Sequence, residues 1–278
     1  LERIGRLVGG RDALELLANA LPSEETNLIS WARWFFLQAS ILEAPQLLEL
    51  VNACQNPTGK ELIKSLLRRQ SASSMEAWAE RLRDPNASIV EEVIDVIVES
   101  ELGEQAKSLF LETLRHQGPS VRARSIEVLT PFYDQTIREA ILPLITDPDE
   151  RVRSSVLRLA MEKQDRSLVP YLAQVARSND CFMYSEDELR TLYETVALLG
   201  DEKHRQLFEE RLDLGSEQSV LGRMFKTKNK AIADTPMRRA ALSGLAVLGD
   251  NKSIALSRKV QGLAELSLAA HCEVVIKL

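Results

Sequence analysis

The stretch Asp147–Ala160 reads DPDERVRSSVLRLA and decides the fold. Asp147 followed by Pro148 predicts a helix start, with the aspartate as N-cap and the proline as the first helical residue. Apolar residues then recur at helical spacing, so the helix carries one apolar stripe. After a break at Asp165, a second helix is expected with apolar residues at Leu168, Val169, Leu172, Val175 and Ala176. Two short antiparallel helices cannot bury both apolar faces alone, so we expect such pairs to stack on one another.

One apolar slot of this pattern returns along the whole chain at nearly constant spacing. Its occupants are Ile4, Phe36, Leu67, Ile97, Leu129, Ala160, Val196 and Leu245. The successive steps are 32, 31, 30, 32, 31, 36 and 49 residues. A period of this size is typical of stacked supersecondary units and not of a single globular core.

The turns repeat as well. Asp84-Pro85 and Gly118-Pro119 precede further apolar stripes, in the same way as Asp147-Pro148. Gly200-Asp201 and Gly249-Asp250 follow two of the long stripes. A glycine that ends one helix and an aspartate that caps the next predict a tight turn between paired helices.

The pattern Asp-Pro, Val-Arg, Ala, Leu and Leu-Gly-Asp resembles HEAT repeats, including the bacterial HEAT-like repeats also found in phycobilin lyases. The resemblance covers essentially the whole chain and implies an all-α fold: a right-handed α-solenoid of about seven to eight stacked helical hairpins. It also implies that the second helices line a concave surface. In HEAT-repeat proteins such a surface grips a partner protein or peptide.

We expect residues 1–278 to form a single array with two irregularities. Leu1–Gly10 matches only the closing half of a first helix, so we expect a truncated first repeat and a segment of a longer protein. The second irregularity is an insertion at residues 213–234, the largest break in the period. Insertions in solenoids fall on one face, and that face is often the binding face.

Composition narrows the function. The chain has 35 basic and 41 acidic residues, a net charge of −6 and a pI near 5.4. This balance argues against nucleic acid as the main ligand. Three cysteines and three histidines are scattered without metal-ligand spacing, so we expect no metal, no cofactor and no catalytic role. No apolar run reaches the roughly 20 residues of a membrane span. Sparse cysteines suit a reducing compartment, and we expect a cytoplasmic protein.

Two places are candidates for partner binding. The insertion combines apolar and basic side chains with no acid between Gly222 and Ala233, namely Arg223, Met224, Phe225, Lys226, Lys228 and Lys230. Apolar anchors beside positive charge suit contact with a partner protein, although a tolerated surface insertion explains them as well. The second candidate is Trp34, in the aromatic cluster Trp31, Trp34, Phe35 and Phe36, whose other members we expect in the core.

Two charged patterns have structural explanations. Arg122, Arg153 and Arg238 occupy one slot, and we expect them to form a ladder with acids of adjacent repeats, such as Asp149. A run of six acids without a base suggests a solvated outer face, with an acidic docking strip as the alternative: Glu91, Glu92, Asp95, Glu99, Glu101 and Glu104.

We therefore expect a non-catalytic scaffold that binds a partner protein or peptide. Two alternatives from other classes share the resemblance. HEAT-like alkylpurine DNA glycosylases use this architecture enzymatically, but the acidic balance and the lack of an aromatic–aspartate constellation count against them. A phycobilin lyase-type protein that binds a chromophore is the other alternative.

Overall fold

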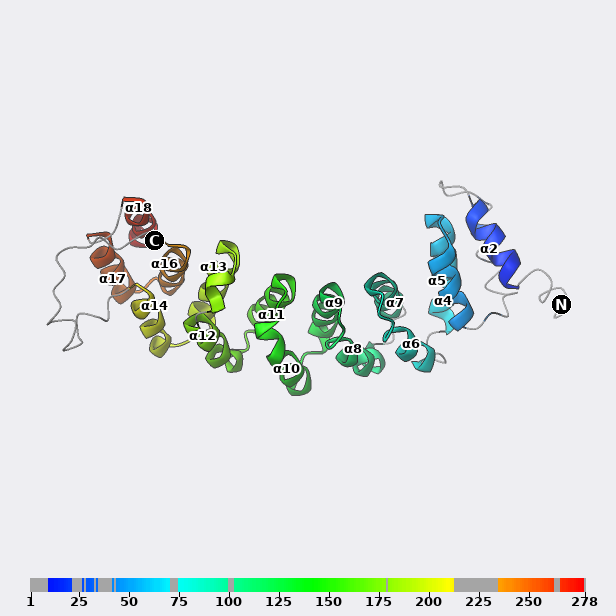
Figure 1. Cartoon of the computed structure of the whole chain (residues 1–278), viewed down its shortest axis with the longest axis horizontal. Coiled ribbons are helices and arrows are strands. Elements are labelled where there is room, and N and C mark those ends of the chain that lie inside the picture. Colours follow the sequence, from blue (N-terminus) through cyan, green and yellow to red (C-terminus); the bar gives the residue numbers. More distant parts are fainter. Residues whose placement is uncertain are drawn as a thin grey trace. The chain divides into compact units, whose positions relative to one another are not determined.

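The computed structural model describes residues 10–21, 27, 29–32, 34, 42, 44–70, 75–99, 103–178, 180–212, 235–262 and 266–277. Within these ranges the fold is all-helical, with no strand (Figure 1). The chain divides into two compact units, Leu1–Ile137 and Arg138–Leu278.

In the first unit, long and short helices alternate. The long helices α5 (Pro57–Gln70), α7 (Ala87–Glu99) and α9 (Pro119–Leu129) pack in succession, and the short helices α6 (Met75–Arg81) and α8 (Lys107–Thr113) each pack on the long helix that follows (Figure 1). At the N-terminal side, α2 (Arg11–Ala20) and α4 (Ala44–Ala53) pack on α5. The short 3-10 segments are η2 (Gly103–Ala106) and η3 (Thr130–Phe132). Helix α10 (Gln135–Ile141) spans the boundary between the units.

The second unit repeats the alternation. Its long helices α11 (Glu150–Lys163), α13 (Glu186–Leu199) and α16 (Pro236–Leu248) pack in succession. The helices between them are α12 (Val169–Arg177), α14 (Arg205–Arg211) and α17 (Asn251–Gln261), and α18 (Leu266–Lys277) packs on both α16 and α17. The 3-10 segments are η4 (Leu142–Thr146), η5 (Arg166–Leu168), η6 (Asp180–Met183) and η7 (Glu202–His204).

The predicted start of α11 is wrong by two residues. Asp149 is the N-cap, and its carboxylate accepts from the backbone N–H of Arg151 at 2.9 Å. Pro148 therefore lies in the preceding turn. Asp147 closes that turn, because its carboxylate accepts from the backbone N–H of Asp149 at 2.9 Å. The helix itself, and the second helix after Asp165, are confirmed.

The two predicted Gly-Asp turns differ in the backbone conformation of their glycines. Gly249 ends α16 with a φ of 60°, a left-handed conformation that favours glycine, and Asp250 caps α17 by accepting from Ser253 N–H at 2.8 Å. Asp201 likewise caps η7, but Gly200 has a φ of −77° and is not left-handed. A Cβ at Gly200 would lie 2.4 Å from the Val196 carbonyl, so close backbone approach explains that glycine.

The recurring apolar slot is buried wherever the structure describes it. Ile4 and Phe36 lie outside the described residues. The other six side chains are at most 1% exposed: Leu67, Ile97, Leu129, Ala160, Val196 and Leu245. The slot read from the sequence is therefore the core position of each long helix.

Ion pairs connect each helix pair to the next. Among the described residues, eight of them join positions 27 to 35 apart, close to one sequence period: Lys60–Glu92, Arg81–Glu49, Arg83–Glu112, Lys107–Asp134, Arg124–Asp95, Arg138–Asp165, Arg177–Glu210 and Arg153–Glu188. Exposed pairs of this kind contribute about 0–1 kcal/mol each. Their repeated spacing orients neighbouring pairs more than it stabilises them.

The buried member of this series is Arg153–Glu188, with side chains 10% and 1% exposed. The guanidinium donates to both carboxylate oxygens, and the Nη2–Oε2 distance is 2.7 Å. The predicted ladder is thus present at Arg153, but its partner is Glu188; Asp149 pairs with Arg151 instead. Arg122 donates to the carbonyls of His116 and Gln117 and so closes its own turn.

The acidic strip on α7 is partly neutralised by flanking helices. Glu92 pairs with Lys60 of α5 at 3.0 Å, and Asp95 pairs with Arg124 of α9 at 2.9 Å. Glu101 lies outside the described residues. A strip whose central acids already have basic partners is poorly suited to dock a basic ligand.

Candidate functional site: two grooves between short helices

Each unit contains an open groove between short helices of consecutive pairs. The groove of the first unit lies between α6 and α8 and has a volume of about 660 Å³. The groove of the second unit lies between α14 and α17 and has a volume of about 810 Å³. In the first unit α6 is positioned by α7 and α8 by α9, so the long helices set the width of the groove.

The α6–α8 groove has an apolar floor. Leu82 is 4% exposed and Leu109 is 7% exposed, and Ala79 lies beside them, partly buried. Thr113 adds no free polar group to the floor, because its hydroxyl is within hydrogen-bond distance of the Phe110 carbonyl and the Ser125 hydroxyl. The floor of the groove can therefore pack against a small apolar side chain of a partner.

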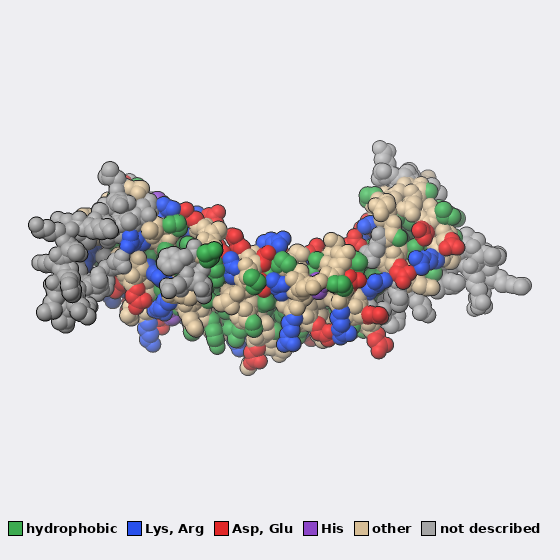
Figure 2. Space-filling view, viewed as in Figure 1, with side chains coloured by type: hydrophobic (Ala, Val, Ile, Leu, Met, Phe, Trp, Pro, Cys, Tyr) green, Lys and Arg blue, Asp and Glu red, His purple; other side chains and the backbone are tan. Residues whose placement is uncertain are grey.

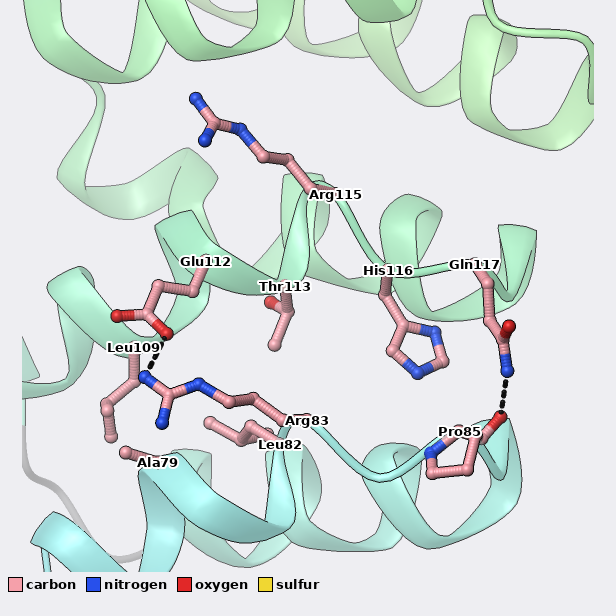
Figure 3. A pocket seen from close by; sticks show the side chains of 10 residues that line it. All are labelled: Ala79, Leu82, Arg83, Pro85, Leu109, Glu112, Thr113, Arg115, His116 and Gln117. Carbon is pink, nitrogen blue, oxygen red and sulfur yellow. Dashed lines mark hydrogen bonds and ion pairs between the residues drawn. The ribbon is translucent and has the colours of Figure 1, made fainter.

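One rim of this groove is an ion pair. Arg83 of the turn after α6 donates to Glu112 of α8 at 2.8 Å, and the two side chains are 66% and 56% exposed (Figure 3). A pair this exposed contributes little to stability and can exchange for contacts with a ligand.

The opposite end of the groove is held by hydrogen bonds between two turns. Gly118 N–H donates to Nδ1 of His116 at 2.9 Å, so that nitrogen is unprotonated. The other ring nitrogen, Nε2, therefore carries the proton and donates to the Asp84 carbonyl at 2.8 Å. Gln117 donates to the Pro85 carbonyl at 2.8 Å (Figure 3). His116 is thus a neutral structural residue that fixes this end of the groove.

Arg115 also lines this groove and is exposed. Its side chain points away from the Arg83–Glu112 pair (Figure 3). No carboxylate among the residues described in the structure pairs with it. Because Glu112 is already paired with Arg83, the lining of the α6–α8 groove carries one unmatched positive charge.

The α14–α17 groove is lined by more charge. Its basic residues are Lys203, Arg205, Lys252 and Lys259, and its acidic residues are Glu202, Glu209 and Glu210. Ala255 and Leu256 of α17 supply apolar surface between them. Arg205, the first residue of α14, is only 6% exposed and pairs with Asp250 at the start of α17.

Of the sequence-predicted site residues, Trp34 is the one that the structure describes, and it lines neither groove. Arg223, Met224, Phe225, Lys226, Lys228 and Lys230 lie outside the described residues. Trp34 is 62% exposed, as expected of an anchor for a partner, and Trp31 is 52% exposed, contrary to the prediction that it lies in the core. Sequence reasoning missed both grooves, although Arg83 and Glu112 stand 29 residues apart, close to the period.

Reactive side chains have structural roles or are buried. His204 completes a capping box with Asp201. The three cysteines are buried free thiols, and burial raises the pKa of Cys272 to about 11. Burial also raises the pKa of Tyr193, whose hydroxyl donates to the Ala176 carbonyl at 3.0 Å. No metal-binding cluster of His, Cys, Asp or Glu exists within the described ranges, nor does any helix there have the length and apolarity to cross a membrane.

Comparisons with known proteins leave the assignment open. No family model matches this chain, and a search of curated proteins found no match. Among solved structures, a crystal structure of an engineered protein from the Northeast Structural Genomics Consortium aligns over 99% of this chain and 94% of its own. The sequence identity is 12% and the TM-score is 0.20. A likeness with so low a score says nothing about the fold or the function of this chain.

Proposed function

We propose that this chain is a non-catalytic scaffold that binds a partner protein or peptide in the grooves between its short helices. In this proposal residues 1–278 form one right-handed α-solenoid of HEAT-like hairpins. The inserted segment 213–234 and the exposed Trp34 contribute further contacts.

Regular stacking supports the scaffold. The recurring slot is buried in all six described long-helix positions, and eight ion pairs among the described residues recur at a separation of 27 to 35 positions. A protein with this organisation buries one continuous core between repeats and leaves its outer faces available for binding.

The observation that carries the proposal is the recurrence of the groove. Both grooves lie between short helices of consecutive pairs, and both combine apolar surface with a charged rim. Protein interfaces use this combination, because apolar anchors supply affinity while charges at the rim set orientation and association rate.

Charge argues against the DNA-binding alternative. The net charge is −6, and on the face drawn in Figure 2 basic and acidic side chains of the described residues are interspersed. A protein that neutralises DNA phosphates needs a continuous basic surface. A salt-dependent mobility shift of duplex DNA would favour that alternative, and a spectral change on adding a bilin would favour chromophore binding.

The proposal is tested by selecting random displayed peptides on the full chain and measuring their affinity by fluorescence anisotropy. Ala79→Arg fills the first groove and Ala255→Arg fills the second. We expect at least one of them to weaken binding of the selected peptides by about tenfold or more, roughly 1.4 kcal/mol. Ser108→Arg, an exposed position of α8 outside the groove lining, adds the same charge and is expected to change binding less than twofold.

Two results would contradict the proposal. One is a selection that enriches no peptide over a control surface. The other is enriched peptides that bind both groove-filling variants as tightly as the parent. In the second case, binding would have to be sought at Trp34 or in the inserted segment.

A further inference from the structure

Arg205 at the base of the α14–α17 groove has unused hydrogen-bonding capacity. A guanidinium carries five N–H donors. Arg205 uses its Nη2 on Asp250, whereas its buried Nε has no acceptor among the described residues. Nη1 meets no acceptor among them either. An arginine that is 94% buried and has one carboxylate partner is under-satisfied.

Asp250 cannot supply the missing contacts. Its Oδ1 accepts from the backbone N–H of Ser253 at 2.8 Å as the N-cap of α17, and its Oδ2 faces Arg205. The pKa of Asp250 is lowered, chiefly because the Ser253 N–H donates to its carboxylate. The carboxylate is therefore ionised and held in place by the helix end, and the rest of the guanidinium remains without a partner.

The acids of the groove lining are largely committed as well. Glu202 faces Lys252 at 3.7 Å, and Glu210 pairs with Arg177 of α12 at 3.3 Å. Among the described residues, no base forms an ion pair with Glu209 and no acid forms one with Lys203. With four basic and three acidic residues, the lining has a net positive charge of one.

The net positive charge of the α14–α17 groove lining favours an acidic occupant, because opposite charges attract across an interface.

We propose that the α14–α17 groove binds a peptide segment of a partner protein through an acidic side chain of that segment, whose carboxylate pairs with Arg205. Ala255 and Leu256 contact a neighbouring apolar side chain of the same segment, and Lys203 and Lys252 flank the carboxylate. The inference rests on the proposed scaffold function and names the chemistry of the partner for one of the two grooves.

The test uses peptides selected on the full chain, first by their composition. We expect enrichment of Asp and Glu over the starting library among peptides whose binding is lost in Ala255→Arg. Replacing the acid by its amide in one such peptide should weaken its binding to the parent about tenfold, as expected for loss of a charge-assisted contact.

Variants of the groove provide the second readout. The double variant Lys203→Glu, Lys252→Glu should weaken binding of the acidic peptide about tenfold at low salt and less at high salt. Arg166→Glu, Arg258→Glu is the matched control, since both arginines are exposed in the same unit and line neither groove. It should change binding less than threefold, because neither side chain lines the groove and exposed charges outside it are screened by salt.

The outcomes separate this inference from the scaffold itself. If selected peptides bind in the α14–α17 groove but show no acidic enrichment, or tolerate the amide replacement, the acidic inference is overturned and the scaffold stands. Equal weakening by the groove and control double variants would overturn it too, because the effect would then be general charge. If no peptide is enriched at all, the proposed function itself fails.

Discussion

Removing the carboxylate of Glu188 tests how neighbouring helix pairs are held together in the second unit. Glu188→Ala leaves the Arg153 guanidinium buried without its anionic partner. In the parent protein the pKa of Arg153 is raised, chiefly by its hydrogen bond to Glu188. The guanidinium also stays charged without Glu188, because an arginine side chain is not deprotonated in proteins. The variant therefore cannot avoid the buried charge by deprotonating Arg153.

The size of the effect follows from the contacts that remain. Removing one partner of a buried ion pair costs about 3–5 kcal/mol. Arg153 keeps its hydrogen bonds to the carbonyls of Asp147, at 2.6 Å, and Pro148, at 2.9 Å. The guanidinium also lies 4.2 Å from the ring centroid of Tyr184, a favourable cation–π contact. These contacts place the expected loss near the lower end, about 3 kcal/mol.

The assay is urea unfolding followed by two signals. All three tryptophans, at positions 31, 34 and 78, belong to the first unit, so tryptophan fluorescence reports on that unit. Far-UV circular dichroism reports on the helices of both units. We expect Glu188→Ala to lower the circular dichroism midpoint. A matched Asp187→Ala variant, whose side chain is 84% exposed on the same helix, should change stability by less than about 0.5 kcal/mol.

Two results would refute this reasoning. The first is a loss for Glu188→Ala as small as that for Asp187→Ala, which would mean that the pair is solvated. The second concerns Arg153→Met, Glu188→Leu, which removes both charges and keeps apolar volume. We expect this double variant to recover most of the lost stability. No recovery would mean that the loss comes from packing rather than from an unpaired charge.

Three further predictions concern the second unit and the inserted segment. Gly244→Ala should destabilise by about 1–3 kcal/mol despite the higher helix propensity of alanine, because a Cβ there would lie 2.6 Å from the ring of Phe208; thermal unfolding checks this, and an unchanged or raised Tm would contradict it. The pKa of Asp250 is lowered in the folded state, so its ionised carboxylate stabilises the fold above a pH of about 4, the ordinary carboxyl value, and this stabilisation is lost as the pH falls through the lowered pKa. The variant Asp250→Asn should therefore lose less stability on acidification than the parent. Parallel profiles of stability against pH would contradict this. The triple variant Lys226→Glu, Lys228→Glu, Lys230→Glu reverses the charge of the inserted segment. It should leave helicity and melting temperature unchanged and weaken the binding of a partner, most clearly at low salt. An unchanged affinity would show that the insertion does not contribute to binding.

The helical pattern was predictable because it depends on local chemistry. Apolar spacing identifies the buried face of a helix, and the slot occupied by Leu129, Ala160 and Val196 is buried as predicted. The turn at Gly249-Asp250 was predictable for the same reason, since a left-handed C-cap and an N-cap are set by adjacent residues.

The predicted N-cap of α11 and the predicted partner of Arg153 were wrong, because several nearby acidic residues could have filled each role. Asp147, Asp149 and Glu150 all stand within one turn of the helix start, and the sequence cannot tell which of them caps it. The structure selects Asp149, while Asp147 closes the preceding turn. The partner of Arg153 lies 35 residues away, and that pairing needs the packing of α11 on α13.

The grooves could not be predicted because they arise from the spacing of short helices. Arg83 and Glu112, or Arg205 and Asp250, become neighbours only when consecutive helix pairs are packed. Nothing in the local sequence marks Arg205 as buried and under-satisfied. The sequence directed attention to the inserted segment, where the charge was obvious, rather than to the helix that precedes it.

In the proposed scaffold, each helix pair depends on its neighbours for its stability. Hydrogen exchange of Leu245→Ala tests it most directly, since Leu245 fills the buried slot of α16 and its truncation should cost about 2–5 kcal/mol. In a stack, exchange should accelerate most in α16, less in its neighbour α13, and not at all in α5 and α7 of the first unit. Equal acceleration in all these helices would show one globally cooperative globule and contradict the account, as would acceleration confined to α16 alone.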